Sequence, residues 1–182
     1  MRLMTYLWNE KGVAGLALIV IVVFFLIGVR VSDVNFIEPR LGLIANTQPF
    51  LFKILKNNFL VGVYIIIGSI SYCIISFSVL GYSAFTIGSI YQGFAKTYST
   101  ADATILILPH GLIELIWLIL LTVCSYNISN SLFSFLKNQD IQPNQIISKT
   151  TFKRLTIACL LIVVGAIVEV YFTIPIFKYL ND

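Results

Sequence analysis

The chain has 182 residues, of which 58% are hydrophobic and only 11% are charged. Soluble domains have about 25% charged residues, so this composition excludes an ordinary soluble protein and indicates an integral membrane protein. The net charge of +4 comes from Lys and Arg beside apolar segments, where lipid headgroups explain it and no nucleic acid is needed.

Four apolar stretches are long enough to cross a bilayer, for which about 20 residues are needed. They are residues 13–29, 59 to about 93, 103–123 and 155–177. The first resembles the core of a signal peptide, but it is longer than the usual apolar region of about 7–15 residues and no cleavage site follows it. We therefore expect an uncleaved membrane helix there.

Two loops join these stretches. Residues 31–58 contain Pro39 and Pro49, and end in the sequence FLFKILKNN, which is typical of a short amphipathic helix lying at the membrane surface. Residues 125–154 are rich in Asn and Gln and are expected to form a polar connector.

The stretch of residues 59–93 is too long for one crossing. As a single helix it would measure about 52 Å at 1.5 Å per residue, against a hydrocarbon core of about 30 Å. We expect a break near Gly81, followed by a short fifth span or a re-entrant half-helix at residues 82–94. Ala84-xxx-Gly88 and Ser89-xxx-Gly93 give this piece a face of small residues for close helix packing. The distribution of Lys and Arg alone favours four spans, whereas the length of the stretch favours five.

Polar residues interrupt the third apolar stretch at ILPHGLIEL, residues 107–115. Pro109 lacks a backbone N–H and clashes with the preceding turn, so the helix is expected to kink or begin there, with Gly111 close by. His110 and Glu114 are four residues apart and share one face of a helix. Ionisable residues in a membrane segment are costly and indicate a functional site by default.

Further candidates are Glu169, in the fourth apolar stretch, and the pair Asn57–Asn58, which directly precedes the second. A carboxyl group that faces lipid has no donor, whereas one inside the bundle can bond to a histidine or an amide. We therefore predict an interior polar cluster in which His110 and Glu114 meet Glu169 or the pair Asn57 and Asn58. The alternative is that each polar side chain bonds to a nearby backbone group and the residues do not meet.

A catalytic interpretation of this cluster is a zinc site with His110, Glu114 and Glu169 as ligands. The metalloprotease motif H-E-x-x-H is absent, and the chain has a single histidine. We therefore favour a structural cluster that fixes the helix register, and expect no catalytic residue, no metal and no cofactor. Cys73, Cys124 and Cys159 match no metal motif and are expected to be small buried hydrophobic residues.

Three motifs occur in a fixed order: an Asn-Asn pair in FKILKNNFLVGVYIIIGSI, P-H-G-x-x-E in ILPHGLIEL, and A-x-x-E with a closing proline in GAIVEVYFTIP. In this order they resemble the stage II sporulation protein M family over about residues 50–176. The family commonly continues E-L-P-A where this chain has ELIW, and its usual Asn-Gly is replaced here by GYSAFTIG. The matching residues are Asn57, Asn58, Pro109, His110, Gly111, Glu114, Glu169 and Pro175.

The resemblance implies an all-helical, multi-pass protein of the cell membrane, a bundle of four or five membrane-embedded helices without established enzymatic chemistry. We expect one transmembrane domain over residues 1–182. Residues 1–58 would hold the first span, the loop and the interfacial helix, and residues 59–177 the family core.

The resemblance also implies partners. The protein after which the family is named is a scaffold that recruits peptidoglycan-degrading partners during engulfment. Relatives accompany ATP-binding subunits in gene clusters for circular bacteriocin export and self-protection. We therefore expect a homodimer or a larger complex in the lipid bilayer, with an ATP-binding subunit or a cell-wall hydrolase as candidate partners.

Two functions follow from these observations. In the first, the chain is a non-enzymatic scaffold or permease-like subunit of an envelope complex for peptide export, self-protection or peptidoglycan remodelling. In the second, it is an intramembrane metal-dependent hydrolase or peptide-processing enzyme that uses His110, Glu114 and Glu169. Co-purification with a partner would favour the first, and loss of a cleavage product on mutation would favour the second.

Overall fold

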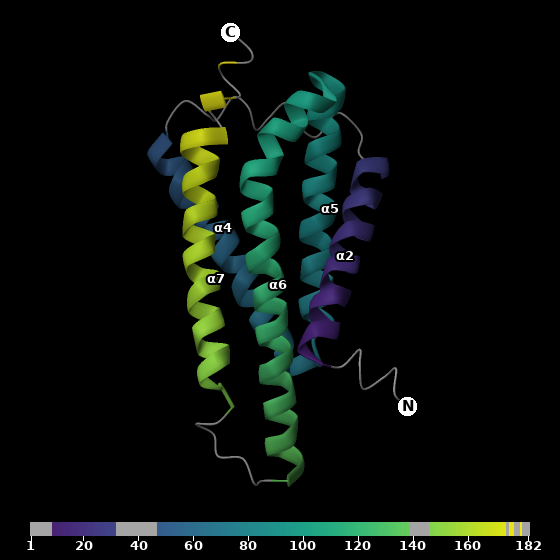
Figure 1. Ribbon diagram of the computed structural model, residues 1–182, viewed down its shortest axis with the longest axis vertical. Coiled ribbons are helices and arrows are strands. Elements are labelled where there is room, and N and C mark those ends of the chain that lie inside the picture. Colours follow the sequence, from purple (N-terminus) through teal and green to yellow (C-terminus); the bar gives the residue numbers. More distant parts are fainter. Residues whose placement is uncertain (1–8, 32–46, 139–145, 174, 177–178, 180–182) are drawn as a thin grey trace.

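The computed structural model describes residues 9–31, 47–138, 146–173, 175, 176 and 179. Within these residues, five long helices run side by side along one axis (Figure 1). They are α2 (Glu10–Val31), α4 (Thr47–Ile67), α5 (Ile74–Thr97), α6 (Thr100–Asn138) and α7 (Lys149–Val168). A 3₁₀ turn, Gly68–Ser71, follows α4, and α7 continues into a π-helix, Glu169–Thr173.

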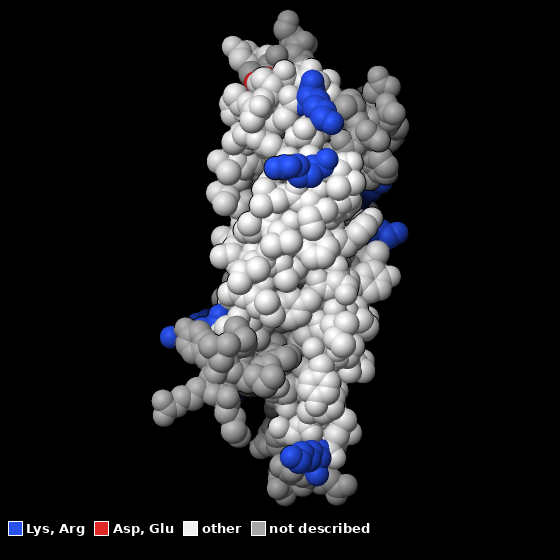
Figure 2. Space-filling model, turned by 90° about the vertical axis from the view of Figure 1, so that its right-hand side faces the viewer, with Lys and Arg blue, Asp and Glu red and all other residues white. Residues whose placement is uncertain are grey.

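Five segments of the described chain are long and apolar enough to cross a membrane. Large apolar side chains are exposed along the outside of these helices, as expected where lipid rather than water surrounds them. Figure 2 shows a broad uncharged region over the middle of one face, with Lys and Arg above it, below it and at its margins. The expectation of an all-helical, multi-pass membrane protein is confirmed. The segments are Glu10–Val31, Leu51–Ser71, Ile74–Thr97, Thr100–Lys137 and Lys149–Thr173.

The expected helix break near Gly81 is wrong. Residue 81 lies inside the continuous 24-residue helix α5, where the missing side chain leaves room for the ring of Phe24. The break lies earlier, between α4 and α5, where Tyr72 and Cys73 have left-handed backbone angles (φ 51° and 66°). The second half of the long stretch is therefore a full-length helix rather than a short span or half-helix at residues 82–94.

The expected surface helix at FLFKILKNN is also absent, because residues 51–58 belong to the first half of the continuous helix α4. Likewise, α6 continues to Asn138, so the first part of the expected polar connector is helical. Residues 32–46 and 139–145 lie outside the described residues.

The helices α2 and α5 approach so closely that their backbones touch. A Cβ atom at Gly28 would collide with the carbonyl oxygen of Phe85, and a Cβ atom at Gly88 with the carbonyl oxygen of Phe25. The Ser89 hydroxyl donates to the Gly28 carbonyl across the same contact (3.4 Å). The small-residue face at Ala84 and Gly88 is thus confirmed as a site of close helix packing.

The long helix α6 lies at the centre of the bundle. Its residues Trp117, Leu118 and Leu121 are buried in a core that includes side chains of all four other long helices. The helix continues through Pro109 without interruption, and Figure 1 shows that its N-terminal turns bend away from the axis of the rest. Of the two expectations for Pro109, a kink or a helix start, the structure shows the kink.

A charged contact ties three helices together at the end of the bundle where α2 and α7 begin. Arg154 donates two hydrogen bonds to the Glu10 carboxylate (2.8 and 2.9 Å), and Asn127 donates a third (2.7 Å). Both charged side chains are partly exposed, so the pair adds modest stability, about 0–1 kcal/mol.

The cysteines divide into two groups. Cys73 and Cys124 are buried as expected, but Cys159 is exposed on the outside of α7. The expectation of three buried thiols is wrong for Cys159, because a small apolar side chain in a membrane span can face lipid as readily as protein.

Five crossings place the two ends of the chain on opposite sides of the membrane. We expect single cysteines introduced at the exposed positions Asn9 and Tyr179 to react with a membrane-impermeant maleimide from opposite sides. The parent for this experiment is a variant with Cys73, Cys124 and Cys159 replaced by Ala, which should not be labelled. Labelling of both positions from the same side would contradict five crossings.

The contact between α2 and α5 gives a second test. Gly28→Val places two methyl groups against the backbone of α5, so we expect a loss of stability of about 1–3 kcal/mol or more. Gly15→Val, in the same helix, is the matched control because nothing lies within 4 Å of its Cβ position. Thermal unfolding in detergent measures the difference, and equal melting of the two variants would argue against the contact.

Candidate functional site

Polar side chains from α4, α6 and the π-helix meet inside the bundle. Asn58 of α4 is buried, and its side-chain amide donates to the Glu114 carboxyl of α6 at 3.4 Å. This distance is longer than the usual N–H···O separation of about 2.9–3.0 Å. The Glu169 carboxyl interacts electrostatically with Glu114. A hydrogen bond thus joins α4 to α6, and the Glu169 carboxyl of the π-helix lies close enough for its charge to act on Glu114.

A second polar contact lies one helical turn from the first. His110 Nδ1 and Thr173 Oγ1 are 3.3 Å apart, and either the ring N–H or the hydroxyl donates. His110 precedes Glu114 by four residues on α6, and Thr173 follows Glu169 by four residues in the π-helix. The two contacts therefore lie one turn apart on α6, the first to α4 and the second to the π-helix.

The π-helix at the end of α7 determines which side chains reach α6. The backbone N–H of Glu169 is shared between the carbonyls of Ala166 and Gly165, and the wider turn begins at this residue. π-helical turns are rare and are frequently found at functional sites. Pro175 lies two residues after the end of the π-helix at Thr173 and lacks the backbone N–H that would continue the helix.

The structure brings together most, but not all, of the predicted cluster. Asn58 and Glu114 are hydrogen-bonded, and Glu169 lies near enough to Glu114 for their charges to interact. His110 is paired instead with Thr173, which the sequence analysis did not select. Asn57 is exposed and lies outside the cluster, since adjacent residues of a helix face different directions. That the cluster is a functional site remains a prediction.

The zinc interpretation finds no support in the geometry. Among the residues that the structure describes, no group of three His, Cys, Asp or Glu side chains is placed to hold a metal ion. His110, Glu114 and Glu169 therefore do not form the three-ligand site that the hydrolase interpretation requires.

A second interior group of hydroxyl side chains was missed by the sequence analysis. Ser76 donates to the Ile65 carbonyl (2.7 Å) and also lies 2.7 Å from the Ser125 hydroxyl. Ser125 in turn lies 3.7 Å from the Cys73 thiol. The available signal was the spacing of Thr122, Ser125 and Ser129 at i, i+3 and i+7, which puts them on one helical face.

The comparisons with known proteins agree with this architecture. The sequence signature of the family described as stage II sporulation protein M matches residues 13–174. An uncharacterized protein of Methanocaldococcus jannaschii is 30% identical over 139 residues, which are 75% of this chain and 78% of the relative. No solved structure matches the sequence. The family match is wider than the resemblance noted from the motifs, because it also includes the first span.

The contact between Asn58 and Glu114 can be measured by a double-mutant cycle. With Asn58→Leu, Glu114→Leu and the double variant, we expect a coupling free energy of about 0.6 kcal/mol and at most about 1.7 kcal/mol, the range found for hydrogen bonds between membrane helices. Glu114→Gln should be milder than Glu114→Leu because its amide oxygen can still accept from Asn58.

Reversible unfolding in mixed detergent micelles provides the free energies for this cycle. Asn57→Leu is the control, since this neighbouring side chain is exposed and should change stability little. Independent effects of Asn58→Leu and Glu114→Leu, or an equal cost for Asn57→Leu, would contradict the contact.

Proposed function

The chain belongs to the stage II sporulation protein M family, and from this premise we propose that it is a non-enzymatic membrane subunit on which an envelope complex assembles. The observation that supports this most directly is that the interior polar residues make contacts between helices of the bundle. The Asn58–Glu114 contact connects α4 to α6, and the His110–Thr173 contact connects α6 to the π-helix after α7. Such contacts fix helix register and leave the outer surface of the bundle for partners.

The activity of the proposed complex depends on which partner the subunit binds. An ATP-binding subunit would make the complex an exporter for peptides or for self-protection, and a cell-wall hydrolase would make it a remodelling complex. In both cases the chain contributes a membrane-embedded surface. Its described helices have large apolar side chains on the outside, so partner contacts would form largely within the bilayer by close packing and polar bonds.

Asn57 is our candidate for a partner contact. Asn57 is the first residue of the Asn-Asn pair in the family motif, but it is exposed on α4 beside the buried Asn58. An amide at membrane depth gains more from a neighbouring helix than from lipid, because lipid chains offer no hydrogen-bond partner. We propose that its amide bonds to a helix of a second copy or of another subunit.

One observation favours the enzymatic alternative. The separation of 3.3 Å between His110 Nδ1 and the Thr173 hydroxyl is near the reach of a base and a nucleophile. His110 also interacts with the backbone of Leu106 on its own helix. In a catalytic triad this position belongs to a carboxylate that orients the base. The described residues thus supply two members of such an arrangement but not the third.

The proposal is tested by isolating the tagged chain from its own host's membranes with a styrene–maleic acid copolymer, which retains neighbouring proteins. We expect a homodimer or a stable complex with an ATP-binding subunit or a cell-wall hydrolase. Asn57→Leu should reduce the recovered partner several-fold without changing thermal unfolding. Thr156→Leu is the matched control, since Thr156 is exposed on α7 and its hydroxyl bonds to its own helix (3.1 Å).

Two results would count against the proposal. One is a monomer without partners even when candidate subunits are co-expressed. The other is a peptide cleavage product that disappears in His110→Ala and Thr173→Ala while the complex remains intact, which would favour the peptide-processing enzyme.

A further inference from the structure

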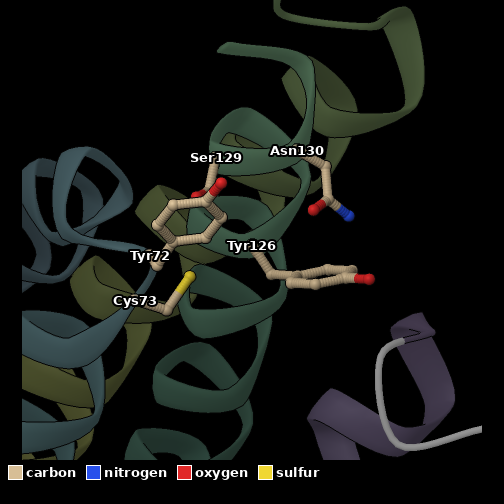
Figure 3. Close-up of a pocket in the computed structure, with 5 residues that line it drawn as sticks. All are labelled: Tyr72, Cys73, Tyr126, Ser129 and Asn130. Atoms are coloured by element: carbon tan, nitrogen blue, oxygen red, sulfur yellow. The ribbon is translucent and has the colours of Figure 1, made fainter. Parts of the chain in front are cut away.

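A cavity of about 250 Å³ lies between the turn that joins α4 to α5 and the helix α6 (Figure 3). Figure 3 shows Tyr72 and Cys73 from the turn on one side and residues of α6 on the other. Tyr126, the nearest of these to the polar cluster in sequence, is 12 residues beyond Glu114, which is about 18 Å along a helix. The cavity is therefore separate from that cluster. Its lining residues are Tyr72, Cys73, Tyr126, Ser129 and Asn130.

The backbone on the turn side is irregular. Tyr72 and Cys73 both adopt left-handed angles, a conformation that usually requires glycine and that persists only where surrounding contacts hold it. Here the Tyr72 ring stacks on Phe133 of α6, with ring centroids 3.4 Å apart, and the Cys73 thiol contacts Ser125. In membrane proteins, irregular backbone is tolerated where it is buried in protein or lines a cavity.

The cavity wall contains a hydroxyl group without a hydrogen-bond partner. Ser129 is 1% exposed, and its hydroxyl oxygen has no hydrogen-bond partner among the described residues. The Cys73 thiol, a weak hydrogen-bonding group, is a neighbour of this hydroxyl, but the geometry between them is not that of a hydrogen bond. Buried polar atoms are nearly always bonded to protein, water or a ligand, so this hydroxyl points to an occupant of the cavity.

The position of the cavity along the bundle indicates which part of the membrane supplies the occupant. The neighbour of Tyr126 along α6 is Asn127, which bonds to Glu10 at the beginning of α2. Figure 3 shows the beginning of α2 beside Tyr126. The cavity is thus near the end of the bundle, at the level where lipid headgroups and tyrosine side chains are found.

The lining indicates the chemical class of the occupant. No charged side chain is among the lining residues, so neither a phosphate nor an ammonium group would be neutralised there. Aromatic rings beside hydroxyl and amide groups suit a neutral group with several hydroxyls. The volume equals that of about eight water molecules at about 30 Å³ each, enough for one sugar ring.

We propose that this cavity binds the uncharged sugar headgroup of a membrane glycolipid, with Asn130 and Ser129 as hydrogen-bonding residues and the lipid chains outside the cavity. The proposal does not depend on the proposed assembly function. It rests on the irregular turn, the unpaired Ser129 hydroxyl and the uncharged lining.

Native mass spectrometry of the full chain in phosphatidylcholine nanodiscs containing glucosyl diacylglycerol tests the proposal. We expect the chain to retain the glycolipid, and Asn130→Leu and Ser129→Val to weaken its retention at least tenfold. Asn130 is exposed, so its variant should fold even if the buried Ser129→Val does not. Ser78→Val is the matched control, because Ser78 is exposed on α5 and bonds to its own helix (2.9 Å).

Separate samples with phosphatidylglycerol and with free glucose distinguish the sources of the headgroup. Preference for glucosyl diacylglycerol over both, lost in the cavity variants and kept in Ser78→Val, supports the site. Equal retention of phosphatidylglycerol would overturn the preference for an uncharged group. Equal binding of free glucose would overturn a membrane lipid as the ligand, and glycolipid retention unchanged by Asn130→Leu would overturn the cavity as its location.

Discussion

A backbone carbonyl or N–H in the hydrocarbon of a bilayer has no water to bond, and leaving it unpaired costs several kcal/mol. This constraint explains the five long helices, and it also explains how the interruptions between them are built. At the break after α4, the Gly68 carbonyl accepts from the backbone N–H of Cys73 and from the Ser71 hydroxyl. The Ile65 carbonyl, near the end of α4, accepts from Ser76 of the next helix.

The same constraint relates the two interior polar groups to the irregular parts of the chain. The serines Ser76 and Ser125 lie beside the turn between α4 and α5, whereas Glu169 and Thr173 lie in the π-helix at the end of α7. In each place a departure from regular α-helix brings polar side chains of two segments together. Polar contacts of this kind add little stability each, about 0.6 kcal/mol on average, but they distinguish one helix register from its neighbours.

Close packing contributes the stability of helix association that the polar contacts do not. Apolar side chains are as compatible with lipid as with protein, so membrane helices associate through the fit of their surfaces rather than through the hydrophobic effect. The contact of Gly28 and Gly88 with the backbone of the opposite helix gives α2 and α5 this fit. The central helix α6 then holds this pair and α7 in one bundle, which leaves the outer faces available to lipid and to the partners that we propose.

The sequence by itself determined the membrane class, the approximate positions of the spans, the family and the interior polar residues Asn58, His110 and Glu114. These features depend on composition, on the length of apolar stretches and on the high cost of polar groups in lipid, all of which are local properties. The small-residue face at Ala84 and Gly88 was also recognisable, although its partner Gly28 was not.

Only the tertiary structure decided where the long apolar stretch breaks and which polar residues meet. Gly81 stays in a helix because Phe24 fills the space beside it, while Tyr72 and Cys73 adopt left-handed angles because contacts with α6 hold them. His110 and its partner Thr173 are 63 residues apart in the chain, and the π-helix that aligns them has no local signature. Such pairings depend on how helices pack, and no periodicity within one segment encodes them.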